Sequence, residues 1–266
     1  AVSANDMAKW LALQLAGGKL PGGERLFSEA SHAEMWTPVV ITPTGKQPAS
    51  LAALQANFST YALGWSVRDY RGVKLVMHGG AVLGFQCVVA LLPAQNVGVS
   101  ILINSEDGEI VLGLLYELLD HYLGFPKADW PGKLSAFKQE RLAGAEKAIA
   151  AVGTERAAVG PSLALERYTG TYADAWYGNI EVTKEGEGLR IDFRSTPRMA
   201  GRLEHWQYDT FVTRFDDPTI EPAYVTFTLD ASGKIDRVKM KAVSPVADFS
   251  WDYHDLDFEP VAVAKK

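Results

Sequence analysis

The residues best suited to chemistry lie in one glycine-rich stretch, 77–85, which reads Met-His-Gly-Gly-Ala-Val-Leu-Gly-Phe. Adjacent glycines at Gly79 and Gly80 remove side chains where a ligand or another backbone has to approach. The imidazole of His78 can donate a hydrogen bond to an anionic or carbonyl group beside them. The alternative is a tight bend that contains an incidental histidine. The residues alone leave both interpretations open.

The remaining histidines and the cysteine predict no metal or other cofactor. His32, His121, His205 and His254 show no His-x-x-His or carboxylate spacing on a shared helix face, as a metal site would need. Cys87 is the one cysteine, so the chain has no intramolecular disulfide. Its apolar neighbours predict a strand, and we expect a packed, unreactive thiol.

Two short matches have a spacing that could serve nucleophilic catalysis. Ser135 and Lys138 have Ser-x-x-Lys spacing, and Tyr177 with Asn179 has Tyr-x-Asn spacing. In a chain with 14 serines and 14 lysines, about one Ser-x-x-Lys match is expected by chance. We therefore interpret Ser135 and Lys138 as a solvated helix face and Tyr177 as a strand aromatic. A self-contained catalyst built from these residues is the competing interpretation.

The glycine-rich stretch lies within a predicted series of antiparallel strands. Apolar and β-branched runs, separated by turn-forming residues that include Gly80 and Pro93, predict extended segments over 61–70, 73–77, 82–92 and 97–103. Helical periodicity predicts helices over 3–16, where Ser3 can cap the first turn, over 29–36 and over 109–123. The last of these helices should cover the sheet.

A second unit of short strands follows a connector. Composition shifts to Ala, Lys, Glu and Gly over 126–160, where one helix is predicted at 134–152. Strands are then predicted over 168–172, 179–184, 189–194, 203–215, 223–229, 235–243 and 249–253. A small antiparallel barrel is the natural closure of such strands. Aromatic side chains there, Trp176, Trp206, Tyr208, Trp251 and Tyr253, could line a pocket or fill the core, and the acidic residues of 252–259 predict a solvated terminal strand edge.

Charge and hydropathy exclude two broad classes of partner. The net charge of the 266 residues is −6, which argues against binding a phosphate backbone as the main task. The longest apolar runs fall short of the ~20 residues that cross a bilayer. We expect no nucleic-acid partner and no membrane span.

With these elements in order, the sequence resembles the serine beta-lactamase-like hydrolases, which include class C beta-lactamases, D,D-peptidases and esterases. His78-Gly79-Gly80 is similar to the third motif of that family. The resemblance also rests on segments 3–11, 61–65 and 97–104, and it covers residues 1–125. Residues 126–160 are then a helical connector, and 161–266 resemble the lipocalin-like barrel often appended to such enzymes. The implied fold class is α+β: an antiparallel sheet with covering helices, part of a beta-lactamase-like domain, followed by a small barrel.

The resemblance implies acyl transfer to or from an ester, amide or beta-lactam through an acyl-enzyme. It gives His78, Gly80 and Ala81 catalytic positions, with the Ala81 N–H as an oxyanion donor, and Gly79, Gly84 and Phe85 substrate-binding positions. Gly79 stands where many relatives carry Thr or Ser. The missing hydroxyl favours an esterase or peptidase over an antibiotic hydrolase.

In the family, the nucleophilic Ser-x-x-Lys and the Tyr-x-Asn precede the segment that resembles 3–11, and neither occurs there in this chain. We therefore expect a C-terminal portion that is inactive alone and that needs the N-terminal half of the catalytic domain as a partner. Its substrate would be a small-molecule or peptide acyl compound. The resemblance also implies that the protein is exported to the periplasm or secreted. The alternative is a non-catalytic module that binds peptides or cell-wall fragments.

Overall fold

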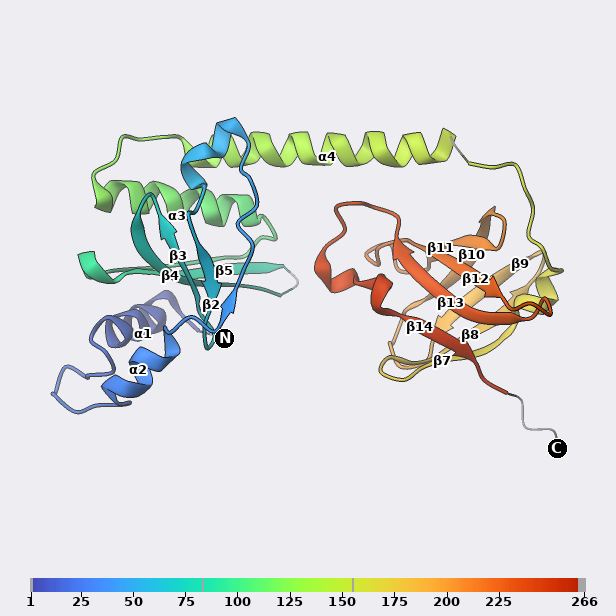
Figure 1. Ribbon diagram of the computed structural model, residues 1–266, viewed down its shortest axis with the longest axis horizontal. Helices are drawn as coiled ribbons and strands as arrows, with labels where there is room; N and C mark the ends of the chain where they lie inside the picture. The colour runs from blue at the N-terminus through green and yellow to red at the C-terminus, as the bar shows by residue number, and fades with distance from the viewer. Residues whose placement is uncertain (1, 83, 155, 263–266) are drawn as a thin grey trace. The chain divides into compact units, whose positions relative to one another are not determined.

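The computed structural model describes residues 2–82, 84–154 and 156–262, so Leu83 of the glycine-rich stretch lies outside the described residues. The chain divides into two compact units, and the boundary along the sequence lies between Gln139 and Glu140. The first unit is a six-stranded antiparallel sheet with helices, and the second contains a closed eight-stranded antiparallel barrel (Figure 1). The α+β prediction is therefore confirmed.

The strands of the first unit follow one another across the sheet in chain order, and every neighbouring pair is antiparallel. Such an order needs only short connections, as the turn residues predicted. The strands are β1 (Val40–Ile41), β2 (Ser59–Tyr61), β3 (Ser66–Tyr70), β4 (Val73–Val82), β5 (Phe85–Leu92) and β6 (Val97–Ile103), with 3-10 turns η1 (Ala49–Leu54) and η2 (Pro93–Gln95).

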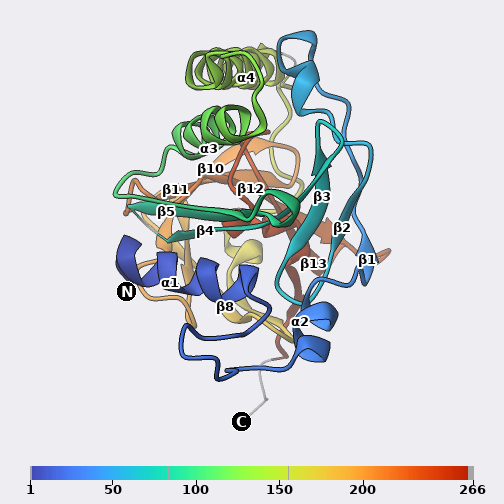
Figure 2. The ribbon, with the colours of Figure 1, turned by 90° about the vertical axis from the view of Figure 1, so that its left-hand side faces the viewer.

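Helices cover both faces of this sheet. Helix α1 (Ala4–Leu15) begins at a capping box in which Ser3 and Asp6 satisfy each other's backbone N–H groups. Helix α2 (Glu29–Met35) follows it, and α3 (Gly108–Leu123) ends at Gly124 in the left-handed conformation. Figure 2 shows α1 on one face of β4 and β5 and α3 on the other. Helix α4 (Trp130–Thr154) contributes residues to both units.

The two faces of the sheet bury separate apolar cores, and alternate residues of β4 enter each. Leu75 packs with α3 and the start of α4, whereas Val76 packs with Leu11 of α1 and with Trp36 and Trp65. Because side chains alternate along a strand, residues 78, 80 and 82 share the α1 face and residues 77, 79 and 81 share the α3 face.

A buried carboxylate fastens the α3 side of the sheet. Asp120 is 2% exposed and accepts hydrogen bonds from Tyr70 Oη at 2.6 Å, Trp130 Nε1 at 2.7 Å and Arg71 Nη1 at 3.0 Å. Burial, followed by the bond to Asp120, raises the pKa of Tyr70. The network ties a strand, α3 and α4 together through one anion.

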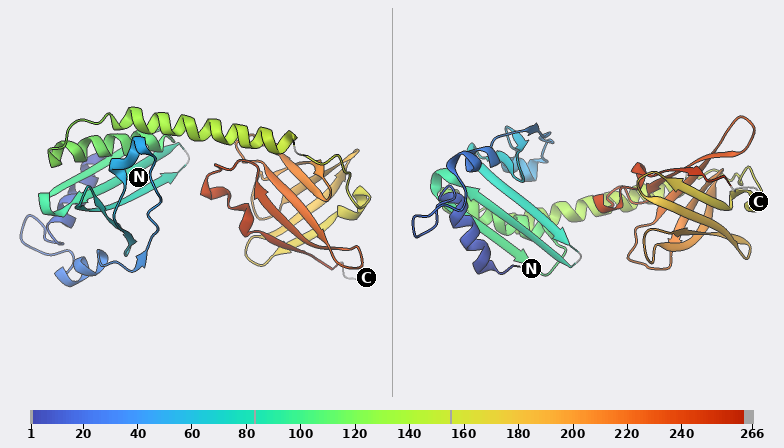
Figure 3. Two further views of the ribbon diagram at one scale, coloured as in Figure 1. Left: turned by 45° about the horizontal axis from the view of Figure 1, so that its top comes forward. Right: turned by 90° about the horizontal axis from the view of Figure 1, so that it is seen from below.

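The barrel of the second unit closes because its last strand pairs with both its first strand and the strand before it. Figure 3 shows these strands from two sides. They are β7 (Gly170–Asp174), β8 (Gly178–Glu185), β9 (Gly188–Phe193), β10 (Ala200–Gln207), β11 (Thr210–Phe215), β12 (Ala223–Leu229), β13 (Ile235–Ala242) and β14 (Asp257–Pro260), with η3 (Leu165–Tyr168), η4 (Phe249–Trp251) and η5 (Tyr253–Asp255) between or before them.

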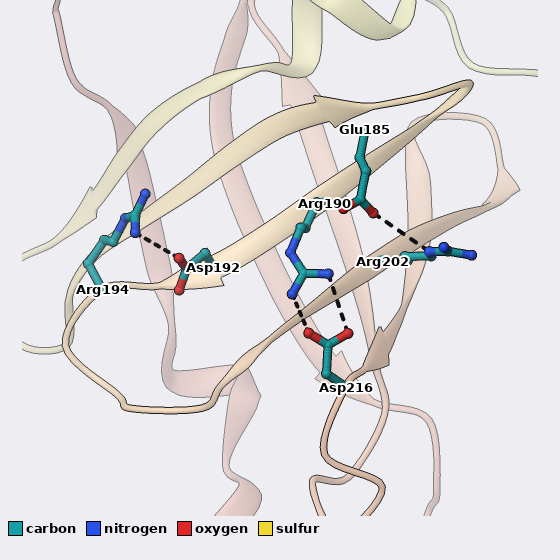
Figure 4. Close-up of polar contacts among 6 residues, drawn as sticks. All are labelled: Glu185, Arg190, Asp192, Arg194, Arg202 and Asp216. Carbon is teal, nitrogen blue, oxygen red and sulfur yellow. Dashed lines mark hydrogen bonds and ion pairs between the residues drawn. The ribbon is translucent and has the colours of Figure 1, made fainter.

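Alternation along each strand separates an aromatic interior from a charged exterior. The interior holds Tyr168, Tyr172, Phe211, Phe227 and Phe258, all at most 3% exposed. On the outside, three ion pairs involve residues in or next to β8–β11: Arg190 of β9 with Asp216, which follows β11, Arg202 of β10 with Glu185 at the end of β8, and Arg194, which follows β9, with Asp192 of β9 (Figure 4). These exposed ion pairs contribute little stability each, roughly 0–1 kcal/mol, but they keep the outer face polar.

Three strand predictions for the second unit were wrong in detail. The segment predicted as one strand over 203–215 is a hairpin, because the chain turns at Tyr208 (φ 47°) between β10 and β11. The segment 249–253 forms 3-10 turns instead of a strand. The acidic terminal segment is no edge, since β14 lies between β13 and β7 and completes the barrel.

No helix among the described residues combines the length and the apolar character that crossing a bilayer requires.

Candidate functional site

The candidate site lies where β4 continues past the end of its neighbour. Strand β3 pairs with β4 only from Val73 to Met77, whereas β5 pairs with it from Val76 to Val82. Within the described residues, the segment 78–82 thus has one hydrogen-bonded edge and one open edge. In an antiparallel strand, alternate residues direct both their N–H and C=O groups to the same edge. The open edge therefore offers backbone donors and acceptors to a bound group.

His78 stands at the beginning of this open edge and is exposed. Its Nε2 atom lies 3.0 Å from the hydroxyl oxygen of Tyr61, the last residue of β2, and the two ring centroids are 6.0 Å apart. One ring nitrogen is thus engaged by a phenol, and the other is the atom with which His78 can meet a ligand. Tyr61 was not among the predicted site residues, although it begins the Tyr-Ala-Leu-Gly-Trp segment that the sequence analysis singled out.

Gly79 and Gly80 do not form the corner that the sequence suggested. Both are ordinary strand residues of β4, and the chain turns only after Val82, where Gly84 has a φ of +83°. A Cβ at Gly79 would meet only the Cys87 carbonyl, at 3.5 Å, and one at Gly80 would meet the Cys87 Sγ at 3.3 Å. The glycines therefore leave open space beside the strand instead of allowing a bend, so the tight-bend interpretation is wrong.

Gly84 and Phe85 form the tip of the β4–β5 hairpin, where Gly84 takes a conformation that favours glycine. The Gly84 N–H donates to Glu106 Oε1 at 2.7 Å, and Gln86 Nε2 donates to the Glu106 carbonyl at 3.0 Å. Glu106 thus holds the tip against the segment that follows β6. The Gly84 N–H is already satisfied, which leaves Phe85 as the tip residue free to contact a ligand.

An open groove of 830 Å³ begins at Gly80 and runs along the hairpin. Its lining residues are Val2, Gly80, Ala81, Val82, Phe85, Gln86, Cys87, Leu102, Ile103 and Asn104. Val82 is 71% exposed and Phe85 57%, and Cys87 is exposed as well, contrary to the predicted packed thiol. Three of the predicted site residues, Gly80, Ala81 and Phe85, line the same groove.

Ser135 and Lys138 do not form a nucleophile and its base. The Lys138 amine lies 3.2 Å from Asp107 Oδ1 and 3.5 Å from Glu109 Oε2. Burial lowers the pKa of Lys138, but the hydrogen bond and charge of these carboxylates outweigh it and raise the pKa. An amine held protonated cannot accept a proton from Ser135. Ser135 is exposed, as predicted, whereas Lys138 is only 27% exposed and is therefore less solvated than predicted.

Among the described residues, one group of three possible metal ligands gathers, namely Asp252, His254 and Asp255, with ligand atoms within 4.8 Å of one another. All three are exposed. The sequence spacing did not indicate this group, because two consecutive 3-10 turns bring the three side chains together.

Comparison with known proteins matches the two units to separate families. The family described as Beta-lactamase matches residues 1–123, and a domain of unknown function, DUF3471, matches residues 154–260. Among solved structures, the octameric penicillin-binding protein homologue from Pyrococcus abyssi aligns over 90% of this chain and 45% of its own, with a TM-score of 0.39 and 18% identity. SurE aligns over 88% and 42%, with a TM-score of 0.32 and 16% identity.

Two curated relatives are hydrolases. Unguisins hydrolase ungD of Aspergillus violaceofuscus is 30% identical over 189 residues, which cover 65% of this chain and 33% of that protein. Unguisins hydrolase ungD' of Aspergillus campestris is 26% identical over 190 residues, covering 68% and 33%. The chain spans about a third of the length of these relatives. Residues 1–123 match the Beta-lactamase family model, and this match, with the hydrolase relatives, supports a serine beta-lactamase-like hydrolase family for the first unit.

Proposed function

We propose that this chain is the C-terminal portion of a serine hydrolase that works through an acyl-enzyme, and that the attacking serine lies in polypeptide outside the 266 residues. The observation that supports this most is the open edge of β4 at His78–Val82 beside an open groove. The family of residues 1–123 and the hydrolase relatives support the same reaction class.

The open edge suits a carbonyl substrate because it presents fixed backbone groups. An N–H directed outward there can donate to the oxygen that gains charge when the carbonyl is attacked, and we assign this role to Ala81. Loss of one such donor typically costs ~3 kcal/mol of transition-state stabilisation. The missing side chains at Gly79 and Gly80 let the substrate lie against the strand. His78, oriented by Tyr61, can contact the substrate or the proton network of the incoming serine.

The polypeptide that carries the nucleophile is proposed to pack against the apolar groove. Val82, Phe85 and Leu102 are 71%, 57% and 38% exposed on adjacent strands, which is unusual for one continuous patch. Gly80 lines the same groove as this patch, so a segment lying on the patch would pass close to the open edge. Burial of the patch in the longer protein would also cover the thiol of Cys87.

Gly79 indicates the substrate class. Without a hydroxyl at this position, the site has one donor fewer for a substrate carboxylate, so we propose an ester or amide substrate instead of an acidic beta-lactam. Export from the cytoplasm is part of the same proposal and rests on family habit alone.

A fluorophosphonate probe tests the proposal on the longer protein and on this chain by itself. We expect the longer protein to be labelled at a serine outside residues 1–266 and this chain alone to stay unlabelled. Stoichiometric labelling of any serine within the chain, such as Ser135, would contradict the proposal.

A matched pair of glycine variants tests the open edge. Gly80→Val in the longer protein should slow labelling at least ~10-fold, because the new side chain fills the space beside the strand. Gly22→Val is the control, since a Cβ at Gly22 meets nothing within 4 Å. Equal labelling rates in the two variants would show that substrate does not lie along β4.

A further inference from the structure

A second candidate site lies at one end of the barrel, in the second unit. Neighbouring strands of the barrel alternate in direction, so the β7–β8, β9–β10 and β13–β14 connections emerge at the same end. Together they enclose a pocket of 330 Å³. It is lined by Tyr177, Phe193, Thr196, Met199, Ser250, Trp251, Asp252, Tyr253, Asp255 and Leu256.

The wall of this pocket is largely aromatic. Trp251 and Tyr253 stack with ring centroids 6.0 Å apart and an interplanar angle of 22°, and Tyr177 stands 46% exposed in the β7–β8 connection. Phe193 and Met199, each 7% exposed, join the pocket to the barrel core. The pocket therefore offers apolar contact at its base and aromatic surface along its wall.

The charged groups of the lining are carboxylates. Asp252 and Asp255 are 49% and 57% exposed, and no lysine or arginine lines the pocket. The ring nitrogens of His254 lie 3.9 Å from Asp252 Oδ1 and 3.5 Å from Asp255 Oδ1. Arg198 of the β9–β10 connection binds Asp217 instead.

The walls are held in place by hydrogen bonds that do not depend on a ligand. The Asp174 carboxylate accepts from the backbone N–H groups of Trp176 and Tyr177 at 2.7 and 2.8 Å and from that of Asp257 at 2.9 Å. Tyr253 Oη donates to the Glu221 carbonyl at 2.7 Å. A pocket whose walls are fixed in this way loses little entropy when it binds.

From this combination we infer that the barrel end binds an organic ammonium group carried on an apolar stem. Aromatic faces attract a cation, and the two carboxylates compensate its charge. The stem would lie against Phe193 and Met199. A neutral ligand would gain no attraction from the two carboxylates, and an anionic ligand would be repelled by them. The site does not depend on the proposed hydrolase reaction.

Chemical-shift mapping of the full chain by NMR, with EDTA present, tests this inference with benzylammonium as the probe. We expect saturable shifts at Tyr177, Thr196 and Trp251, and binding at least ten-fold weaker for benzyl alcohol, which has the same stem without the charge. Equal binding of the two compounds would overturn the inference. N-acetyl-lysine amide forms a second arm: tighter binding than benzylammonium identifies a peptide side chain as the source of the amine, and weaker binding identifies a free aromatic amine.

Two sets of variants make the assignment specific to the pocket. Asp252→Asn with Asp255→Asn should weaken benzylammonium binding at least ten-fold, and Trp251→Leu should weaken it about three-fold. Glu187→Gln with Asp236→Asn is the control, because it changes the net charge equally at exposed positions outside the pocket lining. Unchanged binding in the first variant, or equal loss in the control, would overturn the inference.

Discussion

The two units bury apolar surface to very different degrees. The barrel closes on itself, and its aromatic core lies at most 7% exposed. The sheet of the first unit buries two cores but leaves Val82 and Phe85 open at its hairpin and Ile110, Leu114 and Leu118 open along one side of α3. The barrel buries its apolar core without help from other polypeptide. The sheet unit leaves apolar side chains exposed, and a further layer of protein could cover them.

The largest expected effect compares two phenylalanines, one from each unit. Phe227→Ala in the barrel core should cost ~3–5 kcal/mol of unfolding free energy, because a side chain 2% exposed leaves a cavity. Phe85→Ala at the open hairpin should change it by less than ~0.5 kcal/mol. Hydrogen exchange of amides in each unit measures both. A large loss from Phe85→Ala would show that the hairpin is already packed.

Asp120→Ala comes next and tests whether the sheet has an independent core. Removing the carboxylate leaves Arg71 and the Trp130 N–H without their buried partner, which should cost ~3 kcal/mol in the first unit. Tyr70→Phe, which removes one hydrogen bond of the same network, should cost only ~1 kcal/mol. Hydrogen exchange in α3 reports the difference. If both variants behave alike, the anion is not the centre of the network.

Two glycine substitutions in the second unit should change the free energy of unfolding by smaller amounts and in opposite directions. Gly201→Ala should destabilise the barrel by ~1–3 kcal/mol, since its Cβ would lie 2.2 Å from the Arg214 carbonyl oxygen and 2.5 Å from the Phe215 Cα. Gly144→Ala should stabilise helix α4 by up to ~1 kcal/mol, because nothing lies within 4 Å of its Cβ. Thermal unfolding of the two variants would move in opposite directions.

The smallest effect concerns acid stability of the sheet. Burial raises the pKa of Asp69, but hydrogen bonds from the Phe58 and Asn57 backbone N–H groups and the Asn57 amide outweigh it, so the folded pKa lies below the ordinary value of 3.8. A depressed folded pKa gives stability that is present above about pH 4 and is lost as the pH falls through the folded value. Asp69→Asn should therefore flatten the acid-induced loss of stability in the first unit below pH 4. An unchanged acid profile by circular dichroism would contradict this.

The sequence predicted the helices of the first unit well because local patterns determine them. Ser3 caps α1 as predicted, and α3 ends at Leu123, where the predicted helix ends. Its strands were predicted less well: the extended segment over 61–70 is two strands, β2 and β3, with Gly64 (φ 79°) in the turn between them, and the strand predicted over 73–77 continues to Val82. The Gly79–Gly80 pair was misjudged, because glycine is as compatible with a strand beside open space as with a turn. The prediction of a single strand over 203–215 was wrong for the converse reason: the chain turns at Tyr208, where no glycine or proline indicates a turn.

By itself, the sequence determined the order of elements, the two-part organisation and the His78-Gly79-Gly80 stretch, since periodicity and turn residues act over a few neighbours. Only the tertiary structure decided that β3 ends at the level of Met77, that Tyr61 meets His78, and that three barrel connections enclose one pocket. These features join residues distant in the chain, and their geometry depends on strand register and closure, which no local pattern specifies.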